Sequence, residues 1–281
     1  MGLKPSGIIT LLTDFGLEEP YAGIMKGVIL SIHPHARLID ITHQAAPGSV
    51  SGAALLIKET YPFFPAGTVH LAVVDPGVGG VRRAIAVETD DHFFVGPDNG
   101  IFWPIIAGAE SAKIINLTES RYFLPEVSNT FHGRDIFAPV AAHLSRGVDP
   151  LKTGAPIDDP VELPLHEPRE KDGVLIGEVV RADHFGNLIT NIRREMLEKF
   201  LGAGRPVIRV GELEVEGLAG SYSEKGEGEP LAVIGSSGHL EISVNLGRAC
   251  DRAGAGASGR AVEGMEVRVF RSKTRLKENI E

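Results

Sequence analysis

A loop with very little side-chain bulk separates an acid from a base in the first half of the chain. Residues 69–74 form an apolar run that predicts a buried strand, and residues 76–80 then supply one proline and three glycines. Asp75 lies at the carboxyl end of this strand, where open α/β sheets bind ligands, and Arg82 follows seven residues later. A carboxylate and a guanidinium placed there could bind and polarise a small molecule. A turn cap at Asp75 and a solvated Arg82 explain these residues equally well.

Two more polar side chains occupy positions that suit chemistry on a ligand. Asp14 follows the apolar segment 8–13, a predicted strand, so its carboxylate could accept hydrogen bonds from ligand hydroxyls or form an Asx turn. His132 precedes a predicted helix at 136–144, for which Asp135 is the expected cap. The positive end of a helix dipole favours a nearby anion and a neutral imidazole, which suits acid–base chemistry as well as a helix cap.

Signatures of metal, nucleotide and covalent chemistry are absent from the sequence. His33, His35 and His43 have no cysteine or carboxylate company in a ligand pattern, so we predict no metal site. The sequence has no Gly-x-x-x-x-Gly-Lys-Ser/Thr phosphate loop, no Gly-x-Ser-x-Gly elbow and no His-Glu-x-x-His. No covalent nucleophile stands out.

Strands alternate with helices in the first half of the chain. Residues 21–32 space three apolar side chains on one helical face, and residues 49–60 form a second helix with Ser49 as its N-cap. Strands are predicted at 8–13, 37–41, 69–74, 84–89, 92–96 and 113–116. The pattern predicts an α/β N-terminal domain with a mainly parallel central sheet.

The second half of the chain has a different pattern. Residues 149–171 contain five prolines and little periodicity, so we interpret them as a linker and place the boundary near residue 165, between domains 1–165 and 166–281. Strands predicted at 173–181, 206–210, 213–218, 231–235, 240–244 and 265–270 indicate a smaller C-terminal β-barrel domain. Two turns there, 183–187 and 235–238, are either ligand-binding loops or ordinary hairpin turns.

Composition narrows the class of protein. The chain of 281 residues is long enough for two domains, and its net charge of −9 argues against a nucleic-acid partner. A single cysteine, Cys250, excludes an internal disulfide and fits a reducing compartment. No apolar run of 18 residues and no signal-peptide pattern is present, so we expect a cytoplasmic protein that does not contact the membrane.

Six short motifs occur along the chain: Thr13-Asp14-Phe15-Gly16, Val74-Asp75-Pro76-Gly77-Val78-Gly79, Gly96-Pro97-Asp98-Asn99-Gly100, Phe131-His132-Gly133-Arg134-Asp135, Asp183-x-Phe-Gly-Asn187 and Ser236-Ser237-Gly238. Together they resemble the S-adenosylmethionine (SAM) hydroxide adenosyltransferase family, the SAM hydrolases related to the fluorinase and chlorinase. They occur in the family's order between about residues 8 and 271. The resemblance is therefore highly specific.

The resemblance implies that water attacks C5′ of the ribose of SAM to give adenosine and methionine, with no cofactor. It implies a homotrimer with SAM at the subunit interfaces. Asp75, Arg82 and His132 match the family's catalytic set, which the halogenating relatives lack. Ser237 stands where the fluorinase has an arginine.

The resemblance also implies roles in substrate binding for several of these residues. Asp14 would hold the ribose hydroxyls and Asn187 would recognise adenine. Asp183 and Ser236 would contact the ammonium and carboxylate ends of methionine.

The expected chemistry is simple. Displacement at C5′ expels neutral methionine from a sulfonium, so the site needs only a placed and polarised water. Two alternatives remain: a halide-dependent adenosyltransferase, and a SAM or adenosine binding protein whose hydrolysis is incidental. The sequence does not indicate which residue takes the proton from water.

Overall fold

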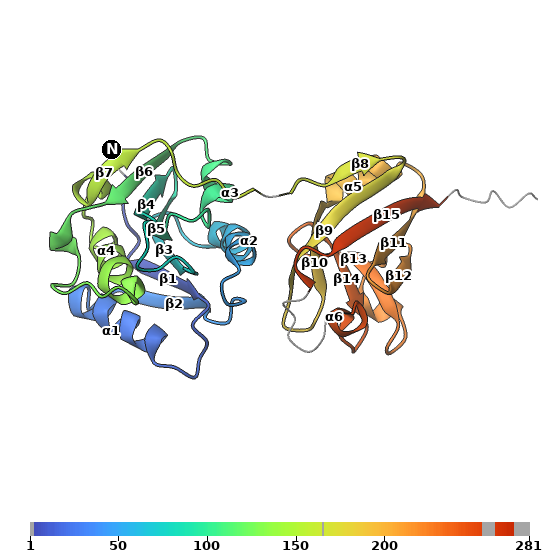
Figure 1. The fold of residues 1–281 in the computed structure, drawn as a ribbon, viewed down its shortest axis with the longest axis horizontal. Helices are drawn as coiled ribbons and strands as arrows, with labels where there is room; N and C mark the ends of the chain where they lie inside the picture. Colours follow the sequence, from blue (N-terminus) through green and yellow to red (C-terminus); the bar gives the residue numbers. More distant parts are fainter. Residues whose placement is uncertain (1–2, 165, 255–261, 273–281) are drawn as a thin grey trace, which may run out of the picture. The chain divides into compact units, whose positions relative to one another are not determined.

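The computed structural model describes residues 3–164, 166–254 and 262–272, and the chain divides after Pro164 into two compact units (Figure 1). Within these ranges, no helix is both long enough and apolar enough to cross a membrane.

The first unit is built on a seven-stranded mixed sheet in the order β2-β1-β3-β5-β4-β6-β7. Its strands are β1 (Ile8–Thr13), β2 (Arg37–Thr42), β3 (Thr68–Val73), β4 (Ala84–Thr89), β5 (His92–Pro97), β6 (Ala112–Leu117) and β7 (Gly154–Ile157). The expected α/β architecture is present, but only β2, β1, β3 and β5 pair in parallel. β4, β6 and β7 add antiparallel pairs. The reversal begins at β4 and β5, because the two residues between them are too few for a crossover.

Helices cover both faces of this sheet (Figure 1). α1 (Tyr21–Ile32) and α4 (Ala138–Ser145) share one apolar core with alternate residues of β1 and β3. α2 (Val50–Thr60) and the short α3 (Trp103–Ile106) pack into a second core on the other face. The predicted N-cap is confirmed, since Ser49 Oγ accepts the Gly52 N–H at 3.1 Å.

The helix predicted at 136–144 begins differently from the expectation. A π-helical segment, Gly133–Phe137, precedes α4, and π-helical turns occur frequently at functional sites. β7 was also unexpected, because it lies in the predicted linker. It contains Pro156 and forms the edge of the sheet, a position where a strand tolerates proline.

The second unit is an antiparallel sheet of eight strands that is nearly closed into a barrel. Its strands are β8 (Arg169–Lys171), β9 (Val174–Ala182), β10 (Leu188–Arg193), β11 (Arg205–Val210), β12 (Leu213–Glu216), β13 (Pro230–Ile234), β14 (His239–Val244) and β15 (Glu266–Ser272). The order is β12-β11-β15-β9-β10-β14-β13, with β8 beside β9. Just after β12, the Ala219 N–H donates to the Ala232 carbonyl of β13 at 2.8 Å, which brings the two sheet edges together. Two helices, α5 (Arg194–Leu201) and α6 (Ala249–Arg252), contribute to its core.

A polar chain crosses the core of the first unit. Thr10 Oγ1 lies 2.8 Å from His70 Nδ1, and His70 Nε2 lies 3.2 Å from His92 Nδ1. Burial, with a smaller contribution from His92, lowers the pKa of His70 to about 3. His70 is therefore neutral in the folded protein at every pH above that value.

The buried imidazole predicts a loss of stability in mild acid. Between pH 6.5 and 3 the unfolded chain binds a proton at His70 that the folded chain does not, so the free energy of unfolding falls as pH falls. One such proton contributes a slope of about 1.4 kcal/mol per pH unit. Urea unfolding followed by the fluorescence of Trp103, the one tryptophan of the chain, reports on the first unit.

His70→Gln supplies the comparison. It should be less stable at pH 7.5 but should lose less stability between pH 6.5 and 5 than the native chain. Equal pH slopes for the two proteins would show that His70 is not the group responsible.

Candidate active site

Asp75 and Arg82 form a nearly buried ion pair. Arg82 Nε donates to Asp75 Oδ1 at 3.0 Å and to Oδ2 at 3.1 Å, and Nη2 donates to Oδ2 at 2.5 Å. The side chains are only 5% and 11% exposed, respectively. The alternative interpretation of Asp75 as a turn cap with a solvated Arg82 is therefore excluded. A carboxylate held by a guanidinium in this way is charge-assisted and fixed in orientation.

His132 extends the pair into a chain of three groups. Arg82 Nη2 lies 2.8 Å from His132 Nδ1, although the two residues are far apart in sequence. Burial, followed by the positive charge of Arg82, lowers the pKa of His132. Asp75, Asp135 and a hydrogen bond with the Ser128 backbone oppose this shift. His132 is therefore a neutral imidazole near pH 7.

The glycine-rich loop that follows β3 has a backbone conformation that allows Asp75, Arg82 and His132 to meet. Gly79 has a φ of +74°, and a Cβ there would lie 2.1 Å from the Asn129 carbonyl oxygen. Only glycine allows the loop to approach the 128–132 segment so closely. Asn99, from the second glycine-rich loop, donates to the Val74 carbonyl at 2.8 Å. That second loop thus supports the first.

Asp135 has a different position from the helix cap that the sequence suggests. Its fully buried carboxylate accepts hydrogen bonds from the Ser128 backbone N–H at 2.8 Å and from the Ser128 hydroxyl at 2.7 Å. Arg134 Nε also donates to it at 2.6 Å. Asp135 therefore ties the π-helical segment to the loop that precedes His132.

Asp14, Asp75 and His132 line one pocket of about 780 Å³. β1 and β3 are parallel neighbours in which Thr13 pairs with Val73, so the residues that follow both strands emerge at the same edge. Gly48 N donates to Asp14 Oδ2 at 2.8 Å, which fixes that carboxylate at the pocket. Asp14 and Asp75, which the sequence analysis placed at the carboxyl ends of two strands, thus lie at the same pocket.

Three aromatic rings form a wall of the pocket that sequence reasoning missed. Phe15, Tyr21 and Phe131 make mutual edge-to-face contacts with centroid distances of 5.3–5.9 Å. Phe15 directly follows Asp14, and Phe131 directly precedes His132. This adjacency to two candidate site residues could have indicated that the rings line the pocket. Such a wall offers an apolar surface on which a flat or sulfur-containing ligand can pack.

The second unit carries the remaining candidate residues on two separate turns. Asp183 Oδ1 accepts the Asn187 backbone N–H at 2.9 Å, and Oδ2 accepts the Asn187 side-chain amide at 2.8 Å. Ser236 and Ser237 are exposed on the turn between β13 and β14. Because β10 and β14 pair antiparallel, with Leu188 opposite Ile242, the 183–187 turn and the 235–238 turn lie at opposite ends of this ladder. Six-residue strands separate them by roughly 20 Å.

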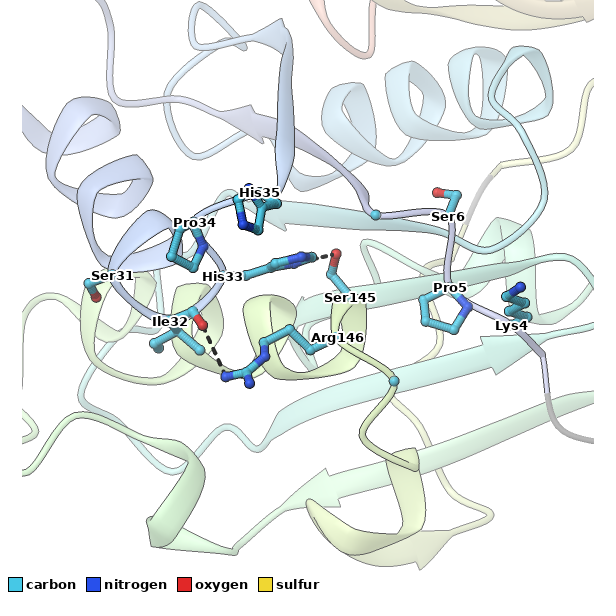
Figure 2. A pocket seen from close by; sticks show the side chains of 12 residues that line it. Lys4, Pro5, Ser6, Ser31, Ile32, His33, Pro34, His35, Ser145 and Arg146 are labelled. Carbon is cyan, nitrogen blue, oxygen red and sulfur yellow. Dashed lines mark hydrogen bonds between the residues drawn. The ribbon is translucent and has the colours of Figure 1, made fainter.

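A larger hollow of about 870 Å³ lies at the other end of α1 and contains two of the three histidines considered as metal ligands (Figure 2). His33 Nδ1 lies 3.2 Å from Ser145 Oγ, and Arg146 Nη1 donates to the Ile32 carbonyl at 3.0 Å. These polar groups bind the ends of α1 and α4 to each other. Among the described residues, no group of three histidines, cysteines or carboxylates could hold a metal ion. The hollow is remote from Asp75 and its partners.

Comparison with family models places the chain. Residues 9–154 match the SAM hydroxide adenosyltransferase N-terminal domain, and residues 177–261 match the C-terminal domain of the same family. A crystal structure of an uncharacterised conserved protein from Thermotoga maritima is similar, with 37% identity and a TM-score of 0.85, covering 94% of this chain and all of that one.

Curated relatives agree with this placement. The chain is 37% identical over 260 residues to an (R)-S-adenosyl-L-methionine hydrolase of Salinispora tropica, covering 90% of this chain and 95% of that protein. It is 26% identical over 270 residues to a fluorinase of an Actinoplanes species, covering 85% and 91% of the two chains. With both of its domains matched and with this level of identity, the chain belongs to the SAM hydroxide adenosyltransferase family.

Proposed function

We propose that this protein hydrolyses SAM to adenosine and methionine by attack of water on C5′ of the ribose. The observation that carries the proposal is the chain of Asp75, Arg82 and His132 beside a pocket that also contains Asp14. The relative at 37% identity is named an (R)-S-adenosyl-L-methionine hydrolase, whereas the fluorinase is at 26%. This difference favours water over halide as the nucleophile.

The reaction needs few catalytic groups because the sulfonium is already a good leaving group. The water oxygen forms a bond to C5′ while the C5′–S bond breaks, and the electron pair of the C5′–S bond moves to sulfur, which leaves neutral methionine. The site must place water in line with that bond and receive one proton. No redox step is involved, and no external acid is needed.

Asp75 is the group we assign to receive that proton. A carboxylate offers about four lone-pair sites, and Arg82 donates to three of them, so one remains to accept a hydrogen bond from water. Arg82 also provides positive charge beside the developing hydroxide. The proton then passes from Asp75 to solvent.

His132 is the group we assign to orient Arg82. A guanidinium only donates, so His132 Nδ1 must be the acceptor in the 2.8 Å contact, and the neutral ring carries its hydrogen on Nε2. The Ser128 backbone, whose hydrogen bond with the ring raises the pKa of His132, lies close enough to accept from a ring N–H. The imidazole therefore fixes the guanidinium and does not compete for the proton.

The remaining candidates would bind the two ends of an extended SAM molecule. Asp14 holds the ribose hydroxyls, and Asn187 recognises adenine. Ser236 and Ser237 sit on the distant turn and bind the methionine carboxylate. Asp183 accepts two hydrogen bonds from Asn187, which orients that residue, and its remaining lone pairs bind the methionine ammonium.

The protein acts, in this proposal, as a homotrimer whose sites are shared between subunits. The catalytic set belongs to the first unit and the adenine and methionine contacts to the second. Each site would combine the first unit of one subunit with the second unit of its neighbour. Exposed apolar side chains beside the pocket support an interface there: Leu17 is 69% and Val81 fully exposed in the isolated chain.

The direct test is incubation of the purified protein with SAM followed by separation of the products. Adenosine and methionine should form in equal amounts, at the same rate with and without EDTA, because the displacement needs no Lewis acid. The same products should form in chloride buffer. Release of 5′-chloroadenosine as the main product would favour the halide-dependent alternative, and binding without turnover would favour a binding protein.

Single alanine replacements of Asp75, Arg82 and His132 should each reduce turnover by roughly 10² to 10⁴, and their effects should not add, because the three groups act as one unit. Lys113→Ala, which removes an exposed ion pair with Glu88, is the control and should leave turnover unchanged. Asp14→Ala should mainly raise KM.

The role of His132 is tested by His132→Asn. The asparagine oxygen takes the place of Nδ1 as acceptor for Arg82, so this variant should be much more active than His132→Ala. The pKa of His132 is lowered, so in the native enzyme kcat/KM should be constant above pH 6.5 and fall only below it, as protonation removes the acceptor. His132→Asn should lack this acid limb. Equal inactivity of both variants would instead identify His132 as the proton acceptor.

Subunit mixing tests the shared site. Asp75→Ala and Asn187→Ala proteins should each be nearly inactive, but refolding an equal mixture brings an intact first unit beside an intact second unit. In a closed ring about a quarter of the sites would carry neither lesion, and activity should recover toward that fraction. No recovery, with mixed trimers detected by mass spectrometry, would place each site within one chain.

A further inference from the structure

A second hydrogen-bonded chain lies directly behind Asp14. Thr13 Oγ1 is 2.9 Å from His43 Nδ1, and His43 Nε2 is 3.1 Å from Asp40 Oδ1. Asp40 Oδ2 accepts a hydrogen bond from Lys26 of α1 at 2.6 Å. The chain thus connects α1, β2 and the end of β1. None of these residues is part of the catalytic set assigned above.

The local backbone is shaped to make this contact. The pairing of β1 with β2 shifts by one residue between Leu11 and Leu12, so that Asp40 pairs with Leu11 and Thr42 with Leu12. Such a bulge re-aims the side chains that follow it and is common beside active sites. Here it precedes His43, whose side chain is only 2% exposed.

The hydrogens of the chain can all be assigned. Asp40 faces His43 Nε2 in a contact that is close but poorly aligned, and a carboxylate only accepts, so the His43 hydrogen is placed on Nε2. Nδ1 is then the acceptor of the Thr13 hydroxyl hydrogen, and Thr13 Oγ1 also accepts the Phe15 backbone N–H at 3.3 Å. Partial burial would raise the pKa of Asp40, but Lys26 and then His43 lower it, so the carboxylate is charged.

The same segment holds the Asp14 loop through its backbone. Gly16 N donates to the His43 carbonyl at 2.7 Å, and Ala45 N donates to the Thr13 carbonyl at 3.2 Å. With the Gly48 contact to the Asp14 carboxylate, the 43–48 segment holds residues 13–16 at both ends. Only the Thr13–His43 bond in this set joins two side chains.

The order of carboxylate, imidazole and hydroxyl is that of a hydrolytic triad, but Thr13 is fully buried and cannot attack a substrate. The hydrogen-bonded series of Asp40, His43 and Thr13 therefore holds nearby residues in position and takes no part in the reaction. Asp14 directly follows Thr13 in the sequence, so a shift of Thr13 would displace the Asp14 carboxylate.

We propose that His43, through its bond to Thr13, is a positioning residue that sets the affinity of the site for the ribose hydroxyls. The inference rests on the proposed function in one respect, namely that Asp14 binds the ribose. Loss of the Thr13–His43 bond would let the 13–16 loop move while Asp75, Arg82 and His132 stay in place. Binding should weaken and the chemical step should not.

Thr13→Val tests this, because valine has the shape of threonine without the hydroxyl. KM for SAM should rise about tenfold and kcat should change less than about twofold, a split that a general loss of stability would not give. Thr13→Ser, which restores the hydroxyl, should recover most of the loss. The dissociation constant of adenosine, measured by calorimetry, should follow KM.

The chain offers a matched control on the same strand. Thr10 is also fully buried, and its hydroxyl contacts a histidine, His70, at 2.8 Å, but away from the pocket. Thr10→Val should cost a similar amount of stability and leave KM unchanged. An equal rise of KM in both variants, or no rise in Thr13→Val, would overturn the inference.

A second pair of variants serves if Thr13→Val fails to fold. The amide of asparagine reaches the position of Nδ1, and that of glutamine reaches the position of Nε2. His43→Asn should therefore keep the bond to Thr13 and a near-normal KM, whereas His43→Gln keeps only the Asp40 contact and should show the raised KM. The reverse order would overturn the inference. If the native protein did not hydrolyse SAM, the proposed function would fail, and the adenosine affinities of the same variants would still decide this point.

Discussion

The Arg82 guanidinium is the interaction on which the site depends. One planar group donates to both oxygens of Asp75 and to His132 Nδ1. A charge with only 11% of its side chain exposed requires such partners, because an unpaired buried charge costs several kcal/mol. The loop at Gly79 and the π-helical segment before α4 are arranged to bring these partners to it. Much of the local backbone geometry follows from pairing this one cation.

The parallel and antiparallel halves of the mixed sheet have different roles. Its parallel half brings the ends of β1 and β3 to one edge, where Asp14 and Asp75 emerge side by side. Support for both comes from behind: the 43–48 segment holds the loop of Asp14, and Asn99 holds the strand end before Asp75. Its antiparallel half extends the core and ends in the proline-bearing edge strand β7. Both carboxylate-bearing loops are thus held by hydrogen bonds from neighbouring segments.

In the second unit the candidate residues lie at opposite ends of the sheet and not at one edge. Antiparallel pairing of β10 and β14 sends their turns to opposite ends of the sheet, which keeps Asn187 and Ser236 apart. A pair of turns separated in this way suits an elongated ligand with different chemical groups at its two ends. Asp183 accepts one hydrogen bond from Asn187 on each of its oxygens, which fixes the orientation of that residue.

The sequence by itself determined the family, the principal helices and strands, and the residue types of the site. Periodicity and capping residues are local properties, so α1, α2 and most strands could be predicted to within a residue or two. What the tertiary structure decided depends on contacts between distant segments. In the tertiary structure Asp75 forms an ion pair with Arg82 instead of capping a turn. Asp135 is buried and accepts hydrogen bonds from Ser128 instead of capping a helix. The tertiary structure also joined His43 to Thr13, and it separated the two turns of the second unit. No local pattern encodes these outcomes. The Asp75 and Asp135 loops are held by close contacts between segments, such as Gly79 against Asn129 and Asn99 on Val74, whereas the other two outcomes follow from strand order and register.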